Sequence, residues 1–143
     1  MQFWKDFAQA FYYTVAPIAI LVAAIGYWRG KRLEAAKWAL QLYEKFYEED
    51  TFKDIRAILD CGESEQSAVD ELVRNESSKF TDYLNFFEFI AYLKQRGQIS
   101  DSDVDALFSY YLGCLKQRAS VYIYIQDPDT GYEHLSELLA ERS

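Results

Sequence analysis

The most constraining feature of the chain is a run of 22 residues without a charged side chain, from Phe7 to Trp28 (FAQAFYYTVAPIAILVAAIGYW). At about 1.5 Å per residue, a helix of this length spans roughly 33 Å, and the hydrocarbon core of a bilayer is about 30 Å thick. Aromatic side chains, which favour the headgroup level, stand at both ends of the run: Phe3, Trp4, Tyr27 and Trp28. The run therefore predicts an N-terminal transmembrane anchor over residues 1–30.

Two other interpretations of this run stay open. A secretory signal peptide needs a basic start and a small-residue cleavage site. Here the chain starts with the nearly neutral Met-Gln-Phe-Trp-Lys-Asp, and aromatic and basic residues directly follow the candidate site Ala24-Ile25-Gly26. A buried helix of a soluble core is the second alternative, although 22 uncharged residues is long for such a helix. A true span is the interpretation that we favour.

Charge and cysteine usage predict which side of the membrane the rest of the chain occupies. Basic residues gather directly after the run, at Arg29, Lys31, Arg32 and Lys37. Because the positive side of a span stays in the cytoplasm, residues 31–143 are expected to form a cytoplasmic domain. Cys61 and Cys114 are interpreted as unpaired core residues, which fits a reducing compartment. Ala19 and Ala23, one helical turn apart, favour self-association of the span and hence a homo-oligomer.

Apolar residues at spacings of three and four predict an all-α domain of about five helices after the span. The first helix, over residues 31–49, carries an apolar stripe of Leu33, Ala36, Leu40, Tyr43 and Tyr47. The most distinctive helix covers residues 79–96 (KFTDYLNFFEFIAYLKQR), with Ser78 as its cap and Gly97 after its end. Val121–Ile125 alternates like a strand but continues a helical stripe, so a helix is predicted there.

Three further helix starts are predicted from hydroxyl side chains. Thr51 with Asp54 three residues later forms a capping pair, and Ser100 with Asp103 forms another. Thr130, after the turn Asp127-Pro128-Asp129, is expected to cap the last helix.

Composition argues against most kinds of catalysis and against nucleic acid. The formal net charge is −8, whereas a protein that coats DNA or RNA needs a basic surface. The single histidine, His134, is interpreted as a solvated helix residue rather than a general base, and no glycine-rich phosphate loop is present. One histidine and two distant cysteines exclude most zinc sites. No enzyme, cofactor or metal is expected, although clustered carboxylates leave a two-metal nuclease as an alternative.

Two polar residues stand inside the aromatic-rich helix over residues 79–96. Asn85 and Glu88 lie about one turn apart, in a helix that is expected to be largely buried. A buried amide or carboxylate must be hydrogen-bonded. A role in helix packing is the favoured interpretation, and contact with a partner or ligand is the alternative.

Six basic residues form the candidate ligand site: Arg74, Lys79, Lys94, Arg96, Lys116 and Arg118. Most of them stand near predicted helix C-termini, where the helix dipole alone explains a positive charge. In an oligomer, however, such residues from several subunits can converge on a polyanionic ligand, with tyrosine rings stacking on its bases.

Several segments resemble a widespread group of bacterial proteins of unknown function that combine one span with a small helical domain. The segments are the basic residues RGKR after the uncharged run, the motif YLNFFEFIAYLKQRGQIS, the helix with FSYYLG and the closing segment DPDTGYEHLSELLAER. The most specific part is Leu84-Asn85-Phe86-Phe87-Glu88 followed by Gly97. Genes of such proteins are common near antiphage defence genes. The layout is also similar to the membrane effectors of type III CRISPR systems, whose cytosolic helical domain binds a cyclic oligoadenylate.

The resemblance implies a homo-oligomeric sensor and effector of antiviral defence in the bacterial inner membrane. In this hypothesis the cytoplasmic domain binds an anionic cyclic oligonucleotide such as cyclic oligoadenylate, and the span then perturbs the lipid bilayer. The alternative is a passive membrane adaptor that docks a protein partner through its aromatic helix. The adaptor hypothesis predicts an exposed Phe/Tyr patch without a small-molecule pocket.

Overall fold

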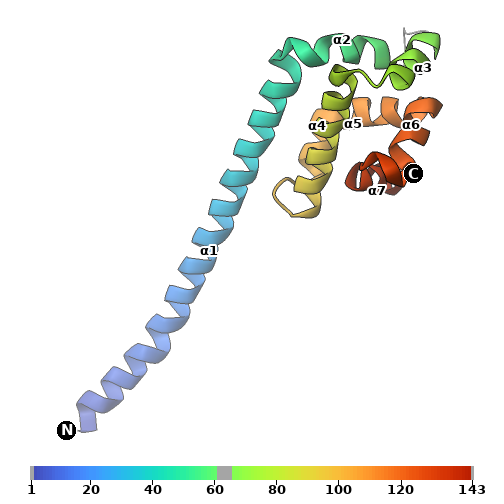
Figure 1. Ribbon diagram of the computed structural model, residues 1–143. Helices are drawn as coiled ribbons and strands as arrows, with labels where there is room; N and C mark the ends of the chain where they lie inside the picture. Colours follow the sequence, from blue (N-terminus) through green and yellow to red (C-terminus); the bar gives the residue numbers. More distant parts are fainter. Residues whose placement is uncertain (1, 61–65, 143) are drawn as a thin grey trace. The chain divides into compact units, whose positions relative to one another are not determined.

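A computed structural model describes residues 2–60 and 66–142, with side chains from residue 18 onward (Figure 1). These residues form an all-helical fold, which confirms the predicted class. The elements of the described chain are α1 (Gln2–Glu48), α2 (Asp50–Leu59), α3 (Gln66–Asn75), α4 (Ser78–Gln95), α5 (Asp101–Gln117), α6 (Ala119–Gln126), the 3₁₀ helix η1 (Pro128–Thr130) and α7 (Glu133–Glu141). The segment Val121–Ile125 lies within α6, as predicted.

The chain divides into two compact units, Met1–Ala35 and Ala36–Ser143. The first unit holds the N-terminal part of α1. The second unit holds the C-terminal part of α1 together with α2–α7, and all features of the candidate site lie within it.

The described part of the first unit does not support the predicted membrane anchor. Large apolar side chains are exposed from Ile18 to Trp28, but these eleven residues make only about 16 Å of helix before Arg29 follows. Residues 3–17, with the rest of the predicted span and its first aromatic pair, lie outside the described side chains. Across the described chain, α1 and the other helices lack a segment long and apolar enough for a membrane crossing. The predicted single-pass localisation in the inner membrane is therefore wrong, and the cytoplasmic placement inferred from it loses its basis.

Aromatic rings form the centre of the second unit. Phe46, near the end of α1, is fully buried. Its ring centroid lies 4.8–6.1 Å from those of seven other rings, namely Tyr47, Phe52, Tyr83, Phe86, Phe87, Phe108 and Tyr111. Because these rings belong to α1, α2, α4 and α5, one side chain connects the end of α1 to three other helices.

The core-facing side of α1 differs from the predicted stripe. Leu40 and Tyr43 of that stripe are 57% and 44% exposed, whereas Leu42 and Phe46 are buried. This part of α1 is apolar on more than one side, so the three-and-four spacing fits two faces of the helix. Burial selects the face whose bulky ring, Phe46, fits between the other helices.

Local capping explains the starts of α4 and α5. Ser77, one residue before the predicted cap, accepts a hydrogen bond from the Phe80 amide through its hydroxyl oxygen (3.3 Å). Gly97 follows α4 with a φ of +66°, a left-handed conformation that favours glycine, as expected. Ser100 accepts a hydrogen bond from the amide of Asp103 (3.1 Å), which confirms the predicted cap of α5.

Other predicted boundaries are wrong. α2 begins at Asp50, before Thr51, and its N-terminus has no side-chain cap. Thr130 lies in η1 rather than at the start of α7, and its hydroxyl donates to the carbonyl of Asp127. The predicted stripe across residues 104–122 is interrupted at Arg118. The domain was predicted to have about five helices, the one over residues 31–49 included, and its described part has the end of α1 and six further α-helices.

The cysteine prediction is also partly wrong. Cys114 is buried on α5, as expected, but it is disulfide-bonded. Cys61 lies outside the described residues. Because disulfides persist in oxidising compartments, the bond removes the argument for a reducing one.

Candidate functional site

A large hollow of the second unit is lined by the end of α1, the start of α2 and the middle of α4. We call it the α1–α4 groove. It has a volume of about 580 Å³ and is lined by Trp38, Gln41, Leu42, Lys45, Glu49, Thr51, Phe52, Asp82, Asn85, Phe86 and Phe89. This volume lies within the range of about 300–1,000 Å³ that is usual for binding pockets.

Helical spacing places these residues on two facing ridges. On α1, Trp38, Leu42 and Lys45 follow one another at intervals of four and three residues. On α4, the intervals from Asp82 to Phe86 and from Phe86 to Phe89 are four and three. Residues at such intervals lie on one side of a helix, so each helix contributes one continuous ridge.

The two ridges run in opposite directions along the groove. Trp38, early on this part of α1, contacts Phe89, late on α4, edge to face with ring centroids 6.1 Å apart. Two turns later on α1, Phe46 stacks on Phe86, earlier on α4, at 5.3 Å. The antiparallel arrangement gives the groove two chemically different ends.

The groove changes from apolar to charged along its length. Its buried floor is made by Leu42, Phe52 and Phe86. The ring pair Trp38 and Phe89 closes the apolar end. The polar lining residues at the other end are Lys45, Glu49, Thr51 and Asp82, and the amides Gln41 and Asn85 lie between the two ends. With two carboxylates and one ammonium group, the charged end is acidic.

The two polar residues of α4 have different roles. Glu88 accepts hydrogen bonds from the backbone amides of His134 (3.1 Å) and Leu135 (2.7 Å), two of the first amides of α7. A carboxylate at this position satisfies amides that have no partner within the helix and stabilises the positive end of its dipole. The predicted packing role of Glu88 is thus confirmed. Asn85, expected to be buried, is exposed and lines the groove.

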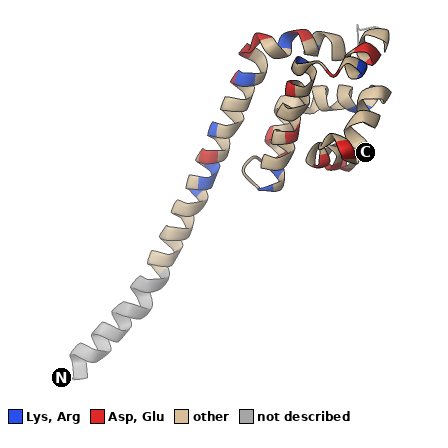
Figure 2. Ribbon diagram, in the orientation of Figure 1, with Lys and Arg blue, Asp and Glu red and all other residues tan. Residues whose placement is uncertain are grey.

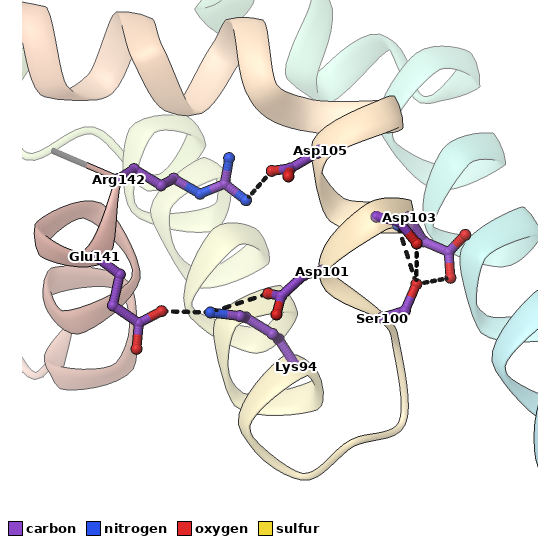
Figure 3. A network of polar contacts seen from close by, with 8 residues as sticks. Lys94, Ser100, Asp101, Asp103, Asp105, Glu141 and Arg142 are labelled. Atoms are coloured by element: carbon purple, nitrogen blue, oxygen red, sulfur yellow. Dashed lines mark hydrogen bonds and ion pairs between the residues drawn. The ribbon is translucent and has the colours of Figure 1, made fainter.

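Lys94 lies in a network that joins α4, α5 and α7 (Figure 3). Its ammonium group forms ion pairs with Asp101 (3.1 Å) and with Glu141, and its side chain is only 20% exposed. The hydrogen bond with Glu141 holds the pKa of Lys94 above its ordinary value. Beside it, Arg142 pairs with Asp105 at 2.6 Å.

Lys116 and Arg118 bind backbone carbonyls. The Lys116 ammonium donates to the carbonyls of Leu139 (3.0 Å) and Arg142 (3.3 Å) at the end of α7. Arg118 donates to the carbonyl of Asp60 and lies between α5 and α6. Lys94 and Lys116 therefore both reach the C-terminal end of α7, where the helix dipole favours positive charge.

The other three predicted ligand residues lie on separate elements. Lys79 on α4 pairs with Asp54 on α2 at 2.8 Å, and its hydrogen bond keeps the pKa of that carboxyl below its ordinary value. Arg96 lies over the ring of Tyr92 (5.4 Å) after α4. Arg74 is exposed in the last turn of α3. Of the six predicted ligand residues, the structure of one chain thus brings together Lys94 and Lys116, at the C-terminal end of α7.

Sequence reasoning did not identify the α1–α4 groove. Gln41 and Lys45 are ordinary exposed residues of a helix, and Asp82 and Asn85 interrupt an aromatic pattern without forming a motif. The sequence did contain one signal for the groove, because Asp82 and Asn85 are polar and fall on the same side of α4. That side is incompatible with full burial of the helix.

Comparisons with known proteins give no family for the chain. It matches no protein-family model, and the searches of curated proteins and of solved structures return no significant match. The resemblance to single-span bacterial proteins and to CRISPR effectors stays an expectation from the quoted segments.

Proposed function

We propose that the chain is a helical docking module that binds an amphipathic helix of a partner protein in the α1–α4 groove. The observation that supports this function most strongly is the groove itself, which joins an apolar floor to a polar rim between two antiparallel helices. Recognition of a helix in such a groove is a recurrent binding mode, in which apolar side chains enter the floor and polar ones fix the register.

The lining defines the chemistry of the partner. The ridge from Trp38 to Glu49 covers eleven residue steps, so a partner helix of about three turns matches its length. Large apolar side chains at i, i+4 and i+7 would contact Leu42, Phe52 and Phe86. A Lys or Arg at one end would face Glu49 and Asp82, whose carboxylates make that end acidic.

Selection from a phage-displayed library of helical peptides against the full chain tests this function. The selected peptides are expected to share the apolar spacing and a terminal basic residue. An arginine at Asn85, in the middle of the groove, should block access, so Asn85→Arg should weaken their binding at least about tenfold in fluorescence anisotropy. Phe89→Ser should weaken it by a similar factor, because it removes one wall of the apolar end.

Matched variants outside the groove serve as controls. Gln117→Arg introduces the same side chain at an exposed amide on α5, and Ile123→Ser replaces a 68% exposed apolar residue on α6. Both should bind the selected peptides as the wild type does. Failure to select any peptide that binds below about 1 mM, or equal binding by Asn85→Arg, would exclude the groove as a docking site.

The messenger hypothesis stays a prediction that concerns other residues. Of its six basic residues, Lys94 and Lys79 form ion pairs within the chain. A polyanion would have to replace these partners, which lowers its net gain in binding energy. A thermal-shift screen with cyclic oligonucleotides addresses this hypothesis separately from the peptide selection.

A further inference from the structure

A second exposed surface, which does not belong to the groove, is rich in tyrosine. On α1, Leu40, Tyr43 and Tyr47 are 57%, 44% and 36% exposed and follow one another at intervals of three and four residues. On α5, the ring of Tyr111 lies 6.2 Å from that of Tyr47 and 5.2 Å from that of Tyr110, which is 53% exposed. We call these five residues the tyrosine patch.

The patch and the α1–α4 groove occupy different sides of α1. Successive residues of an α-helix are rotated by about 100°. Trp38 and Lys45, which line the groove, are therefore rotated by roughly 140–160° from Leu40, the first residue of the patch on α1. A partner on one surface leaves the other accessible.

Contacts within the chain hold the rings of the patch in place. The Tyr47 hydroxyl donates a hydrogen bond to the carbonyl of Leu107 (3.3 Å). The rings of Tyr43 and Tyr47 lie 4.6 Å apart at an angle of 37°. Rings that are already ordered lose little conformational entropy on binding, and tyrosine is enriched at protein interfaces.

Charges beside the patch indicate what covers it. Lys37 precedes Leu40 by three residues, and Glu44 follows it by four. Being seven residues apart, the two charges lie on the same side of the helix and about 10 Å from each other along it. Figure 2 shows that charges of both signs occur along the described part of α1. A second copy that runs antiparallel, centred near Leu40, would place its Glu44 opposite Lys37 and its Lys37 opposite Glu44. A parallel copy in register would oppose like charges instead.

We propose that the tyrosine patch binds a second copy of this chain, forming an antiparallel two-fold dimer centred on Leu40. In such an isologous interface each contact occurs twice. Two Lys37–Glu44 pairs fix the register. Leu40 lies near the two-fold axis, and the tyrosine rings of each copy pack against the partner's α1 and supply the rest of the buried apolar area. The dimer presents two α1–α4 grooves, so a partner with two suitable helices would bind it with higher avidity.

Charge reversal measured by sedimentation equilibrium of the full chain tests the dimer. Lys37→Glu alone and Glu44→Lys alone each turn two attractions into two repulsions, so each should raise the dimer dissociation constant about tenfold. The double variant Lys37→Glu/Glu44→Lys restores opposite charges and should dimerise as the wild type does. An equimolar mixture of the two single variants should form heterodimers, because all four charges then have opposite partners.

Two further variants complete the test. Lys53→Glu reverses an exposed lysine on α2, outside the patch, and should leave the dissociation constant unchanged. Tyr43→Ser should weaken the dimer without loss of helical content by circular dichroism. A wild type that stays monomeric up to about 1 mM would overturn the proposal. It would also be overturned if single reversals had no effect, or if neither the double variant nor the mixture recovered binding.

Discussion

The polar residues on the two sides of α4 have different roles, one in stabilising the fold and one in lining the α1–α4 groove. Toward α7, Glu88 accepts two backbone amides and Lys94 pairs with acidic residues of α5 and α7. Toward α1, Asn85 and Phe89 are exposed and line the α1–α4 groove. The same helix therefore has one side whose polar groups hold the fold together and one side whose polar groups face an open hollow.

The difference between the two sides gives a criterion that distinguishes stabilising residues from binding residues in this domain. A polar residue that satisfies a helix end or a buried charge is expected to matter for folding. A polar residue on the rim of a hollow is expected to matter for binding, with little effect on stability. Variants on each side of α4 test this separation.

The largest effect is expected at Phe46, which joins α1 to the groove side of α4. Phe46→Ala should lower the free energy of unfolding by about 4 kcal/mol, because it removes a fully buried ring and leaves a cavity among seven other rings. Urea denaturation followed by circular dichroism measures this loss. Ile123→Ala, at an exposed position on α6, should change stability by less than about 0.5 kcal/mol. A loss below about 1 kcal/mol for Phe46→Ala would show that the end of α1 is not held by this ring.

The next effect is expected on the α7 side, at Glu88. Glu88→Ala should cost about 3 kcal/mol, because two amides at the start of α7 lose a charged acceptor. Glu88→Gln keeps one acceptor oxygen and should cost about half as much. Hydrogen exchange gives a local readout, since the amides of His134 and Leu135 should lose protection first. Unchanged exchange at these two amides would separate Glu88 from the stability of α7.

Helix starts and ends such as those of α4 and α5 were predictable from the sequence, because the residues that determine them lie within a few positions of one another. Ser100 caps α5 through an amide three residues away, and Gly97 takes the left-handed conformation that ends α4. The segment Val121–Ile125 is helical, as predicted, although its helix begins anew after Arg118 and does not continue α5. Such patterns need no knowledge of the tertiary fold.

The groove and the caps formed over long distances were not predictable in this way. Glu88 accepts hydrogen bonds from α7 amides that lie 46 and 47 residues later, so these partners cannot be identified from spacing. The buried face of α1 depends on which ring fits between α2, α4 and α5, and Leu40 and Phe46 satisfy the same apolar pattern. The transmembrane prediction failed for a different reason: it rested on the absence of charge, and the described apolar part of the run, residues 18–28, is too short to cross a bilayer.

A smaller, pH-dependent effect is expected from Tyr132, at the start of α7. Burial raises the pKa of Tyr132 from 10.0 to about 12. Between these values the unfolded chain releases the phenolic proton while the folded chain keeps it, so stability should fall as the pH rises from 10 to 12. Below pH 10 both states are protonated and this contribution is complete. Urea midpoints at pH 8, 10 and 12 should fall less for Tyr132→Phe than for the wild type. An equal fall in both proteins would assign the alkaline loss to other groups.

The smallest effect is expected from the lysines, and it compares a partly buried ion pair with an exposed one. Lys94→Met should cost at most about 1 kcal/mol, because the 20% exposed side chain of Lys94 pairs with two carboxylates of other helices. Lys79→Met should cause no measurable loss, since Lys79 and Asp54 are both largely exposed. Adding 0.5 M NaCl should reduce the cost of Lys94→Met only in part, because partly buried pairs are screened less than exposed ones. Equal losses for the two lysines would mean that the network in Figure 3 holds α7 no more firmly than a surface pair holds α2. The contrast between the two sides of α4 would then rest on Glu88 alone.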